Sequence, residues 1–256
     1  MEIVIYGLIC FMVFMFGGCL GSFFNVLLCR IPKQQEFIKT RSYCPECNKT
    51  LAWYELIPVF SFLLQRGRCR KCMARMSPQY LIMELLCGGA NLWAFMALGL
   101  TREALPAFIL FPVLVSLSVE DIKKTEIPYW CTGTIAVLGI IATVLSLFPS
   151  VPSEIPWYEH LIGAVIISVP FAVFCYLGAM GGGDVQLTAA AGLLLGWAIV
   201  PSVLFAFIIG GIFGAVVKIS KKRATICFGP FLAIGIAAGY IYGYDIIGWY
   251  AGVLKV

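Results

Sequence analysis

The chain has 256 residues, of which 61% are hydrophobic and only 12% are charged, and its mean hydropathy is +0.95. Soluble domains are only about half apolar even when glycine is counted, so this composition excludes an ordinary soluble protein and indicates a membrane protein with several spans. The net charge of +5 is gathered in a few connections between apolar segments. Positive charge that is clustered in a few connections indicates how the chain is oriented in the membrane. It gives no reason to expect nucleic-acid binding.

Apolar runs of about 20 residues are long enough to cross a bilayer as helices. We therefore predict an all-α polytopic membrane protein with about eight transmembrane helices, near residues 3–29, 78–99, 104–120, 128–148, 158–179, 185–199, 202–219 and 227–249. No basic residue precedes the first run, which is also longer than the apolar part of a signal peptide. We expect it to be a retained helix.

Lysine and arginine are concentrated in alternate connections between these runs. If the N-terminus lies outside, the inner connections hold sixteen of the eighteen basic residues, and only Arg102 and Lys255 lie opposite. Cytoplasmic loops of membrane proteins are enriched in these residues. The sequence therefore predicts an N-terminus outside and a basic inner face, with the lipid bilayer as a partner.

The connection formed by residues 30–77 is polar and contains two Cys-x-x-Cys pairs, Cys44 with Cys47 and Cys69 with Cys72. Four thiolates at such spacing can bind Zn²⁺ tetrahedrally, and a metal can order a loop that is too small to build a core. A redox dithiol pair and two disulfides are the alternatives. The cytosol keeps structural disulfides reduced, and the loop lacks a βαβ context. We favour a structural zinc site, because four thiolates leave no position open for a substrate.

Two aspartates lie at the predicted inner ends of helices. Asp184 follows Gly181, Gly182 and Gly183 at the start of one apolar run, and Asp121 ends another. A charge in the membrane costs about 3 kcal/mol or more, so such an acid is a candidate for function. If a helical bundle brings the two carboxylates together, one keeps a proton. The ionised one can then deprotonate a water while the other polarises a peptide carbonyl.

We expect the three glycines to let an extended substrate backbone approach Asp184 closely. No other catalytic set competes with the two acids. The single histidine, His160, follows Trp157 and Tyr158, and we expect it in an interfacial aromatic belt. That leaves no Ser-His or Cys-His arrangement, and no zinc-protease, phosphate-loop or dinucleotide motif is present.

These features resemble the type IV prepilin peptidases, which are leader peptidases and N-methyltransferases of bacterial inner membranes. The resemblance covers most of the chain. It rests on Gly21-Ser22-Phe23-Phe24-Asn25-Val26, Arg30-Ile31-Pro32, the two cysteine pairs, residues 51–59 and 66–69, Glu84-Leu85, Asp121 with Ile127-Pro128, and residues 181–184.

The resemblance implies that Asp121 and Asp184 form the dyad of an aspartic endopeptidase. Such an enzyme cleaves the basic leader of prepilins or pseudopilins on the cytosolic face, typically between a glycine and a phenylalanine. A second implied activity methylates the new N-terminus from S-adenosylmethionine. We accordingly expect residues 1–29 to form the first transmembrane helix, residues 30–77 a zinc-binding loop domain associated with methylation, and residues 78–256 a seven-helix peptidase domain.

Two positions depart from the family pattern. Tyr129 stands where an aspartate is frequent, and Gln186 stands where a lysine is frequent. Neither replaces a member of the dyad. Without a lysine at position 186, the pKa of Asp184 or its contacts with substrate can differ from the family pattern. Glu55, Glu120 and Glu126 are candidates to hold the basic leader.

Three further polar residues have open roles. Glu84 lies inside an apolar run, where a charge needs a partner, and Arg30 or Arg75 can supply one. A structural ion pair and a role in methyl transfer both remain open for it. Asn25 is expected to join helices. For the whole protein, the alternatives are a scaffold or transporter subunit whose acids carry protons or ions, and a peptidase without methylation.

Overall fold

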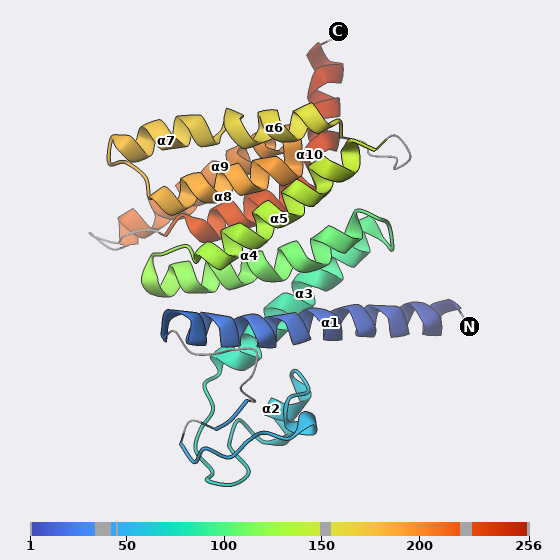
Figure 1. Ribbon diagram of the computed structural model, residues 1–256, viewed down its shortest axis with the longest axis vertical. Coiled ribbons are helices and arrows are strands. Elements are labelled where there is room, and N and C mark those ends of the chain that lie inside the picture. Colours follow the sequence, from blue (N-terminus) through green and yellow to red (C-terminus); the bar gives the residue numbers. More distant parts are fainter. Residues whose placement is uncertain (1, 34–41, 45, 149–154, 221–226, 255–256) are drawn as a thin grey trace. The chain divides into compact units, whose positions relative to one another are not determined.

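The computed structural model describes residues 2–33, 42–44, 46–148, 155–220 and 227–254 (Figure 1). Regular structure in these residues is helical, apart from two isolated β-bridges in the cysteine loop. The predicted all-α class is thus confirmed. Some basic residues that support the predicted orientation lie outside the described residues, namely Lys39, Arg41, Lys221, Lys222 and Arg223, as does Lys255 on the opposite face.

Seven helical stretches in the described part of the chain are long and apolar enough to span a membrane. They contain α1 (Glu2–Arg30), α3 (Gln79–Leu98), α4 (Ala104–Lys124), α5 (Tyr129–Ser146), α6 (Trp157–Ile166) with α7 (Ser168–Tyr176), α8 (Gly182–Leu195) with α9 (Ile199–Ser220), and α10 (Gly229–Leu254). The cysteine loop follows the short helix η1 (Ile31–Lys33) and holds η2 (Trp53–Glu55) and α2 (Phe60–Leu64).

The longest stretch, Gly182–Val217, has 36 residues but is not straight. In a straight helix Phe207 would lie about 35 Å from Asp184, yet both residues line the same cavity. Between them, the short 3₁₀ helix η3 (Gly196–Ala198) begins with a glycine at φ 58°. The chain therefore reverses at η3, and the predicted segments 185–199 and 202–219 correspond to α8 and α9.

Two prolines interrupt the backbone hydrogen bonding of helices, one after α6 and one inside α4. Proline has no N–H and collides with the carbonyl of the residue four positions earlier, and α6 accordingly ends at Ile166, four residues before Pro170. Pro112 lies inside α4. The carbonyl of Phe108, which this proline leaves without its usual donor, accepts a hydrogen bond from Asn91 Nδ2 of α3 at 3.2 Å. A buried amide thus satisfies a backbone group that lipid could not.

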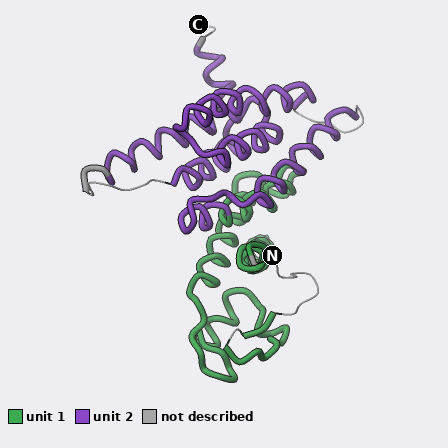
Figure 2. The backbone as a smooth tube through the Cα atoms, turned by 60° about the vertical axis from the view of Figure 1, so that its left-hand side comes forward, with its two compact units in different colours: residues 1–116 green, residues 117–256 purple. Residues whose placement is uncertain are grey.

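The chain forms two compact units, residues 1–116 and 117–256 (Figure 2). In the first unit α1 packs on α3, and a Cβ at Gly17 would lie 2.5 Å from the carbonyl oxygen of Cys87. In the second unit α8 packs against α5 and α6, and a Cβ at Gly192 would lie 2.1 Å from the carbonyl oxygen of Gly163. Small residues at such contacts let membrane helices approach closely.

Candidate active site and cysteine cluster

Asp121 is buried near the C-terminal end of α4. The helix ends directly after it, where the N–H of Thr125 donates to the carbonyl oxygen of Asp121 at 2.8 Å and Thr125 adopts φ 55°. A positive φ is strained for a β-branched residue, and strained backbone gathers at functional sites. The end of α4 thus fixes the acid at a helix boundary.

The start of α10 holds the side chain of Asp121. Its Oδ2 atom accepts a hydrogen bond from the backbone N–H of Gly229 at 3.0 Å. The first N–H groups of a helix have no partner within the helix, and Pro230 has no N–H to offer, so Gly229 is the available donor. The sequence analysis missed Gly229, although a proline at the start of an apolar run is a known signal of a helix start.

Asp184 lies in the first turn of α8, whose N-cap residue is Gly181. The N–H of Asp184 donates to the carbonyl oxygen of Gly181 at 3.2 Å. The carboxylate turns back toward the same residue. A Cβ added to Gly181 would lie 3.6 Å from Oδ2 of Asp184. The positive end of a helix dipole stabilises a carboxylate in this position.

Asp121 and Asp184 line one cavity of about 760 Å³ inside the second unit. They are close enough for their charges to interact. Phe207 and Phe228 also line this cavity, with ring centroids 5.2 Å apart. The structure therefore places both predicted acids at one site, beside an apolar wall that the sequence analysis did not identify. A cavity of this volume has the size of a small-molecule or short-peptide site.

The three glycines before Asp184 leave space and do not supply unusual backbone angles, since none of them has a positive φ. A Cβ at Gly183 would lie 3.0 Å from Ile127 Cβ, so this glycine allows close packing. A Cβ at Gly182 would meet only Cys175 Sγ, at 4.0 Å. Gly182 therefore borders open space at the cavity, where a side chain would occupy room that a ligand could use.

Both positions that depart from the family pattern, Tyr129 and Gln186, line the cavity. Of the three acids considered for the basic leader, Glu126 is exposed and lines it as well. Glu120 is buried and pairs with a lysine of its own helix, and Glu55 is buried in the cysteine loop. Glu126 is thus the acid of the three that faces the site.

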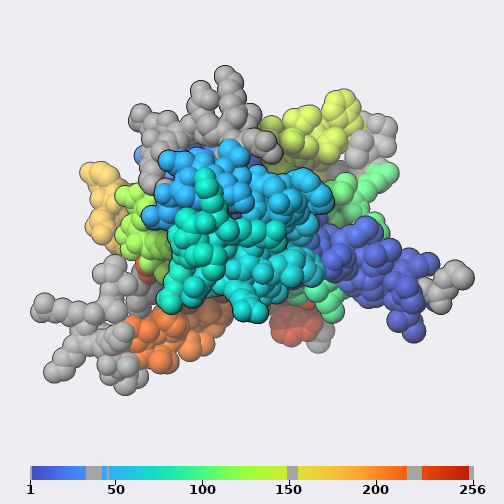
Figure 3. Space-filling view, turned by 90° about the horizontal axis from the view of Figure 1, so that it is seen from below, coloured from blue at the N-terminus to red at the C-terminus, as the bar shows by residue number. Residues whose placement is uncertain are grey.

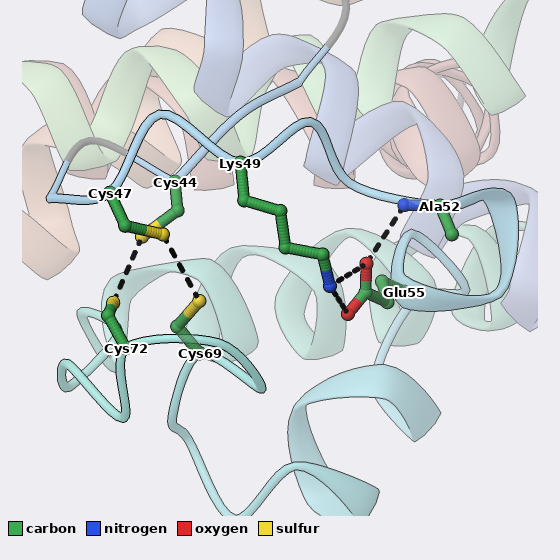
Figure 4. Close-up of polar contacts among 7 residues, drawn as sticks. All are labelled: Cys44, Cys47, Lys49, Ala52, Glu55, Cys69 and Cys72. Carbon is green, nitrogen blue, oxygen red and sulfur yellow. Dashed lines mark hydrogen bonds and ion pairs between the residues drawn. The ribbon is translucent and has the colours of Figure 1, made fainter.

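The four cysteines form a separate cluster in the first unit (Figure 4). Their Sγ atoms all lie within 4.8 Å of one another. The Sγ atoms of Cys44 and Cys72 are 3.8 Å apart, and those of Cys47 and Cys69 are 3.9 Å apart. Tetrahedral zinc with Zn–S bonds of about 2.3 Å requires sulfur atoms roughly 3.8 Å from one another. The donor set therefore fits a four-thiolate metal site.

The two cysteine pairs lie in turns of the same form. In each turn the N–H of the first cysteine donates to the carbonyl oxygen five residues later at 2.9 Å. The residue after the second cysteine, Asn48 or Met73, has a positive φ. Backbone N–H groups of Cys72 and Lys71 lower the pKa of the Cys69 thiol to about 6. A low thiol pKa favours the thiolate, which is the form that binds metal.

Glu84 is buried in α3, and its partners are not the arginines that we expected. Its Oε2 atom accepts the backbone N–H of Val59 at 2.7 Å. Arg30 is buried too, with its guanidinium carbon 5.8 Å from the centre of the Tyr43 ring. The ion pair, one of the two roles left open for Glu84, is not formed among the described residues, because the cysteine loop folds back and brings a backbone donor to the carboxylate.

Asn25 joins α1 to α3, as expected of an interhelical amide. Its Oδ1 atom accepts a hydrogen bond from Gln79 Nε2 at 3.0 Å. The side chain is 1% exposed, so this contact lies within the helix pair. Such hydrogen bonds contribute modestly to helix association in membranes.

The expectation for His160 is wrong. Its neighbours Trp157 and Tyr158 are exposed, as an interfacial belt requires, but His160 itself is 3% exposed. Its Nδ1 atom lies 2.9 Å from the carbonyl oxygen of Leu193 in α8. The helical period turns the fourth residue of α6 inward, so His160 links α6 to α8.

Known proteins are similar to both halves of the chain. Residues 15–98 match the Bacterial Peptidase A24 N-terminal domain, and residues 108–217 match the Type IV leader peptidase family. A protein of Bacillus subtilis (strain 168) named prepilin leader peptidase/N-methyltransferase is 34% identical over 243 residues, which is 93% of this chain and 96% of the relative. The chain belongs to the type IV leader peptidase family. The resemblance inferred from the sequence motifs is confirmed.

Other relatives in this family carry the same name. One from Myxococcus xanthus (strain DK1622) is 35% identical over 224 residues, 84% of this chain and 65% of the relative. Another from Aeromonas salmonicida (strain A449) is 30% identical over 279 residues, 95% of this chain and 94% of the relative. The A24 N-terminal match contains the cysteine cluster, and the leader peptidase match contains Asp121 and Asp184. No solved structure matches the chain.

Proposed function

We propose that the protein is a membrane aspartic endopeptidase that removes the leader peptide from prepilins or pseudopilins. The observation that carries the proposal is that the carboxylates of Asp121 and Asp184 line one cavity. Relatives that match nearly the whole chain are named prepilin leader peptidases. Both acids lie at helix ends. A scaffold or transporter subunit that passes ions through the bundle would instead favour acids at mid-span.

In the proposed mechanism one carboxylate is ionised and the other protonated, because two close carboxylates share a proton. The ionised carboxylate takes a proton from water, and the protonated one hydrogen-bonds to the substrate carbonyl. The water oxygen attacks the carbonyl carbon and forms a tetrahedral diol. The C–N bond then breaks as a proton passes to the leaving nitrogen. The products are a leader with a new carboxyl end and a mature pilin with a free amine.

The free amine is the proposed substrate of the second activity, methylation from S-adenosylmethionine, which the names of the relatives support. When bound, the sulfonium of this donor supplies the methyl group. We assign this activity to the N-terminal part of the protein, with residues 1–29 as its first helix and residues 30–77 as its zinc-binding loop. Residues 78–256 form the proposed peptidase domain. The hydrogen bond that Glu84 accepts from the backbone N–H of Val59 favours a structural role for this acid.

We place the protein in the bacterial inner membrane, with the N-terminus outside and the cavity at the cytosolic face. The distribution of lysine and arginine supports this orientation. A prepilin is made in the cytosol, so its basic leader then reaches the cavity from the side on which it is made. Glu126, at the rim of the cavity, is the proposed partner of leader lysines. No nucleic acid is expected to bind.

Replacing either acid tests the proposal. Asp121→Asn and Asp184→Asn should each lower the initial rate of prepilin cleavage by a factor of about 10² to 10⁴, the usual contribution of a general acid or base. Asp245→Asn, which changes an exposed acid of α10, should cleave at the wild-type rate. The mature pilin should carry an N-terminal methyl group by mass spectrometry. Cleavage by either dyad variant at the rate of the Asp245→Asn control would contradict the assignment.

A further inference from the structure

Residues 56–64 of the cysteine loop are mostly apolar, and four of them, Leu56, Phe60, Leu63 and Leu64, are exposed. The segment reads Leu-Ile-Pro-Val-Phe-Ser-Phe-Leu-Leu, and Leu63 and Leu64 are 58% and 76% exposed. The cysteine loop lies uncovered on the face shown in Figure 3. Contiguous apolar surface of this kind marks a site that contacts another molecule or a membrane.

This segment, which contains α2, lies alongside α1 and not beyond the end of that helix (Figure 1). A Cβ at Gly18 of α1 would lie 3.2 Å from Pro58 Cβ. The rings of Phe11 and Phe60 pack edge to face with centroids 6.3 Å apart. Gly18 lies about 18 Å along the helix from its basic end at Arg30. The segment therefore reaches the depth of the hydrocarbon core, about 30 Å thick, that α1 crosses.

Several backbone N–H groups of the segment are satisfied within the protein, which is the condition that a bilayer imposes on polar groups. The N–H groups of Ser61 and Leu63 donate to carbonyl oxygens of residues 57 and 59. The N–H of Val59 precedes α2, and it donates to Glu84 Oε2 at 2.7 Å. Val59 has φ 63°, which is strained for a β-branched residue. Glu84 holds this strained turn and keeps its N–H from facing lipid.

The residues on either side have the composition of a bilayer boundary. Trp53, 75% exposed, and Tyr54 precede the segment. Arg66, Arg68 and Arg70 follow it and are exposed. Tryptophan and tyrosine gather at the level of lipid headgroups, and clustered basic residues contact anionic lipid.

We infer that residues 56–64 form a re-entrant segment embedded among the acyl chains of the bilayer beside α1. The apolar surface is continuous with the lipid-facing side of α1 through the pair of Phe11 and Phe60. The arginines that follow lie at the phosphate level. The buried acid Glu84 has a structural reason in this arrangement, because it accepts the backbone N–H of Val59 at the start of the turn. The cysteine loop is thus anchored in the membrane by its own middle segment.

Photolabelling of the unmodified full-length protein tests this inference. The protein is placed in nanodiscs that contain a phospholipid with a diazirine in its acyl chain, irradiated, digested and mapped by mass spectrometry. Leu63 and Leu64 should be labelled as strongly as Phe11 of α1. They should be labelled severalfold more than Met73, an exposed apolar residue of the same loop outside the segment. Equal labelling of Leu64 and Met73 would overturn the inference.

A pilin substrate is the competing occupant of this surface. Labelling of Leu64 should stay unchanged when excess prepilin is added, whereas a loss confined to residues 56–64 would show that the surface receives prepilin and would overturn the lipid assignment. Leu64→Asp should reduce acyl-chain labelling of the neighbouring residues severalfold, because a carboxylate is excluded from hydrocarbon. The matched Met73→Asp variant should not. Identical labelling of residues 56–63 in the two variants would count against immersion.

Discussion

At the scale of single residues, the candidate active site depends on backbone groups as much as on carboxylates. The N–H of Gly229 at the start of α10 binds Asp121, and Asp184 turns back toward Gly181 at the start of its own helix. Each acid therefore meets a helix N-terminus, which favours negative charge. Asp121 accepts an N–H from a different helix, whereas Asp184 lies in the first turn of its own helix. The two carboxylates thus have different surroundings, as the two roles of an acid and base pair require.

We expect Gly229→Ala to impair cleavage strongly. The added Cβ would lie 2.6 Å from Asp121 Oδ2 and would displace the carboxylate. Misplacement of a catalytic group by about 1 Å can lower a rate roughly 10²-fold. Gly248→Ala is the matched control on the same helix, because no atom lies within 4 Å of its added Cβ. Equal prepilin cleavage by the two variants would contradict a positioning role for Gly229.

The cysteine loop should lose local stability in acid. A hydrogen bond from the backbone N–H of Ala52 and the ion pair with Lys49 hold the pKa of Glu55 below its usual range (Figure 4). A depressed pKa stabilises the folded loop above the ordinary glutamate value of about 4.3. This contribution is lost as the pH falls through the lower folded value.

Hydrogen exchange of residues 49–55 measures this effect. In the wild type, exchange corrected for its intrinsic pH dependence should rise as the pH falls below about 4. Glu55→Gln should exchange faster at neutral pH and show little further change in acid. A wild-type loop whose protection does not respond to pH would rule out this contribution of Glu55.

At the scale of elements, close helix contacts give the second unit its arrangement. α6 and α8 meet at Gly163 and Gly192, where a Cβ on either residue would lie within 2.4 Å of a backbone oxygen of the other helix. Without a strong hydrophobic force between helices in lipid, such packing supplies much of the association. The same contact fixes α8, whose first turn carries Asp184.

Gly192→Ala should destabilise the protein by about 1 to 3 kcal/mol, the usual cost of overpacking a close contact. Its added Cβ would collide with the backbone of Gly163. Gly133→Ala is the control, because its Cβ meets nothing within 4 Å and alanine favours the helix. Thermal unfolding in detergent should show a lower midpoint for Gly192→Ala alone. An unchanged midpoint would contradict the claim that the close contact between α6 and α8 stabilises the protein.

At the scale of the whole molecule, two sites lie in two compact units. The cysteine cluster belongs to residues 1–116 and the acid-lined cavity to residues 117–256. The two family matches, residues 15–98 and 108–217, follow the same division. Each site is completed by residues of its own unit.

Removal of zinc should loosen the cysteine loop without loosening the cavity. Purified protein should contain one zinc ion per chain, and chelation or Cys69→Ser should remove it, because metal binding supplies the folding free energy of such small loops. Hydrogen exchange should then rise in residues 46–77 but not in α8. Absence of zinc in the purified wild type, or unchanged exchange in the loop after chelation, would contradict the proposed metal site.

The amino-acid sequence by itself determined the membrane-spanning segments, the cysteine cluster and the two candidate acids. Hydrocarbon requires long apolar runs, so α1, α3, α4, α5 and α10 follow from local composition. Short local turns set the geometry of the two Cys-x-x-Cys pairs. Asp121 and Asp184 are recognisable because an acid within a membrane-spanning segment is costly and rare.

Only the tertiary structure decided which distant groups meet. Gly229 binds Asp121 across 108 positions of the chain, Val59 replaces the expected arginine at Glu84, and His160 turns inward to Leu193. Hydropathy and spacing describe neighbours along the chain, whereas a buried hydrogen bond depends on how whole helices pack. The same packing reverses the chain at η3, which brings Phe207 to the cavity that Asp184 lines.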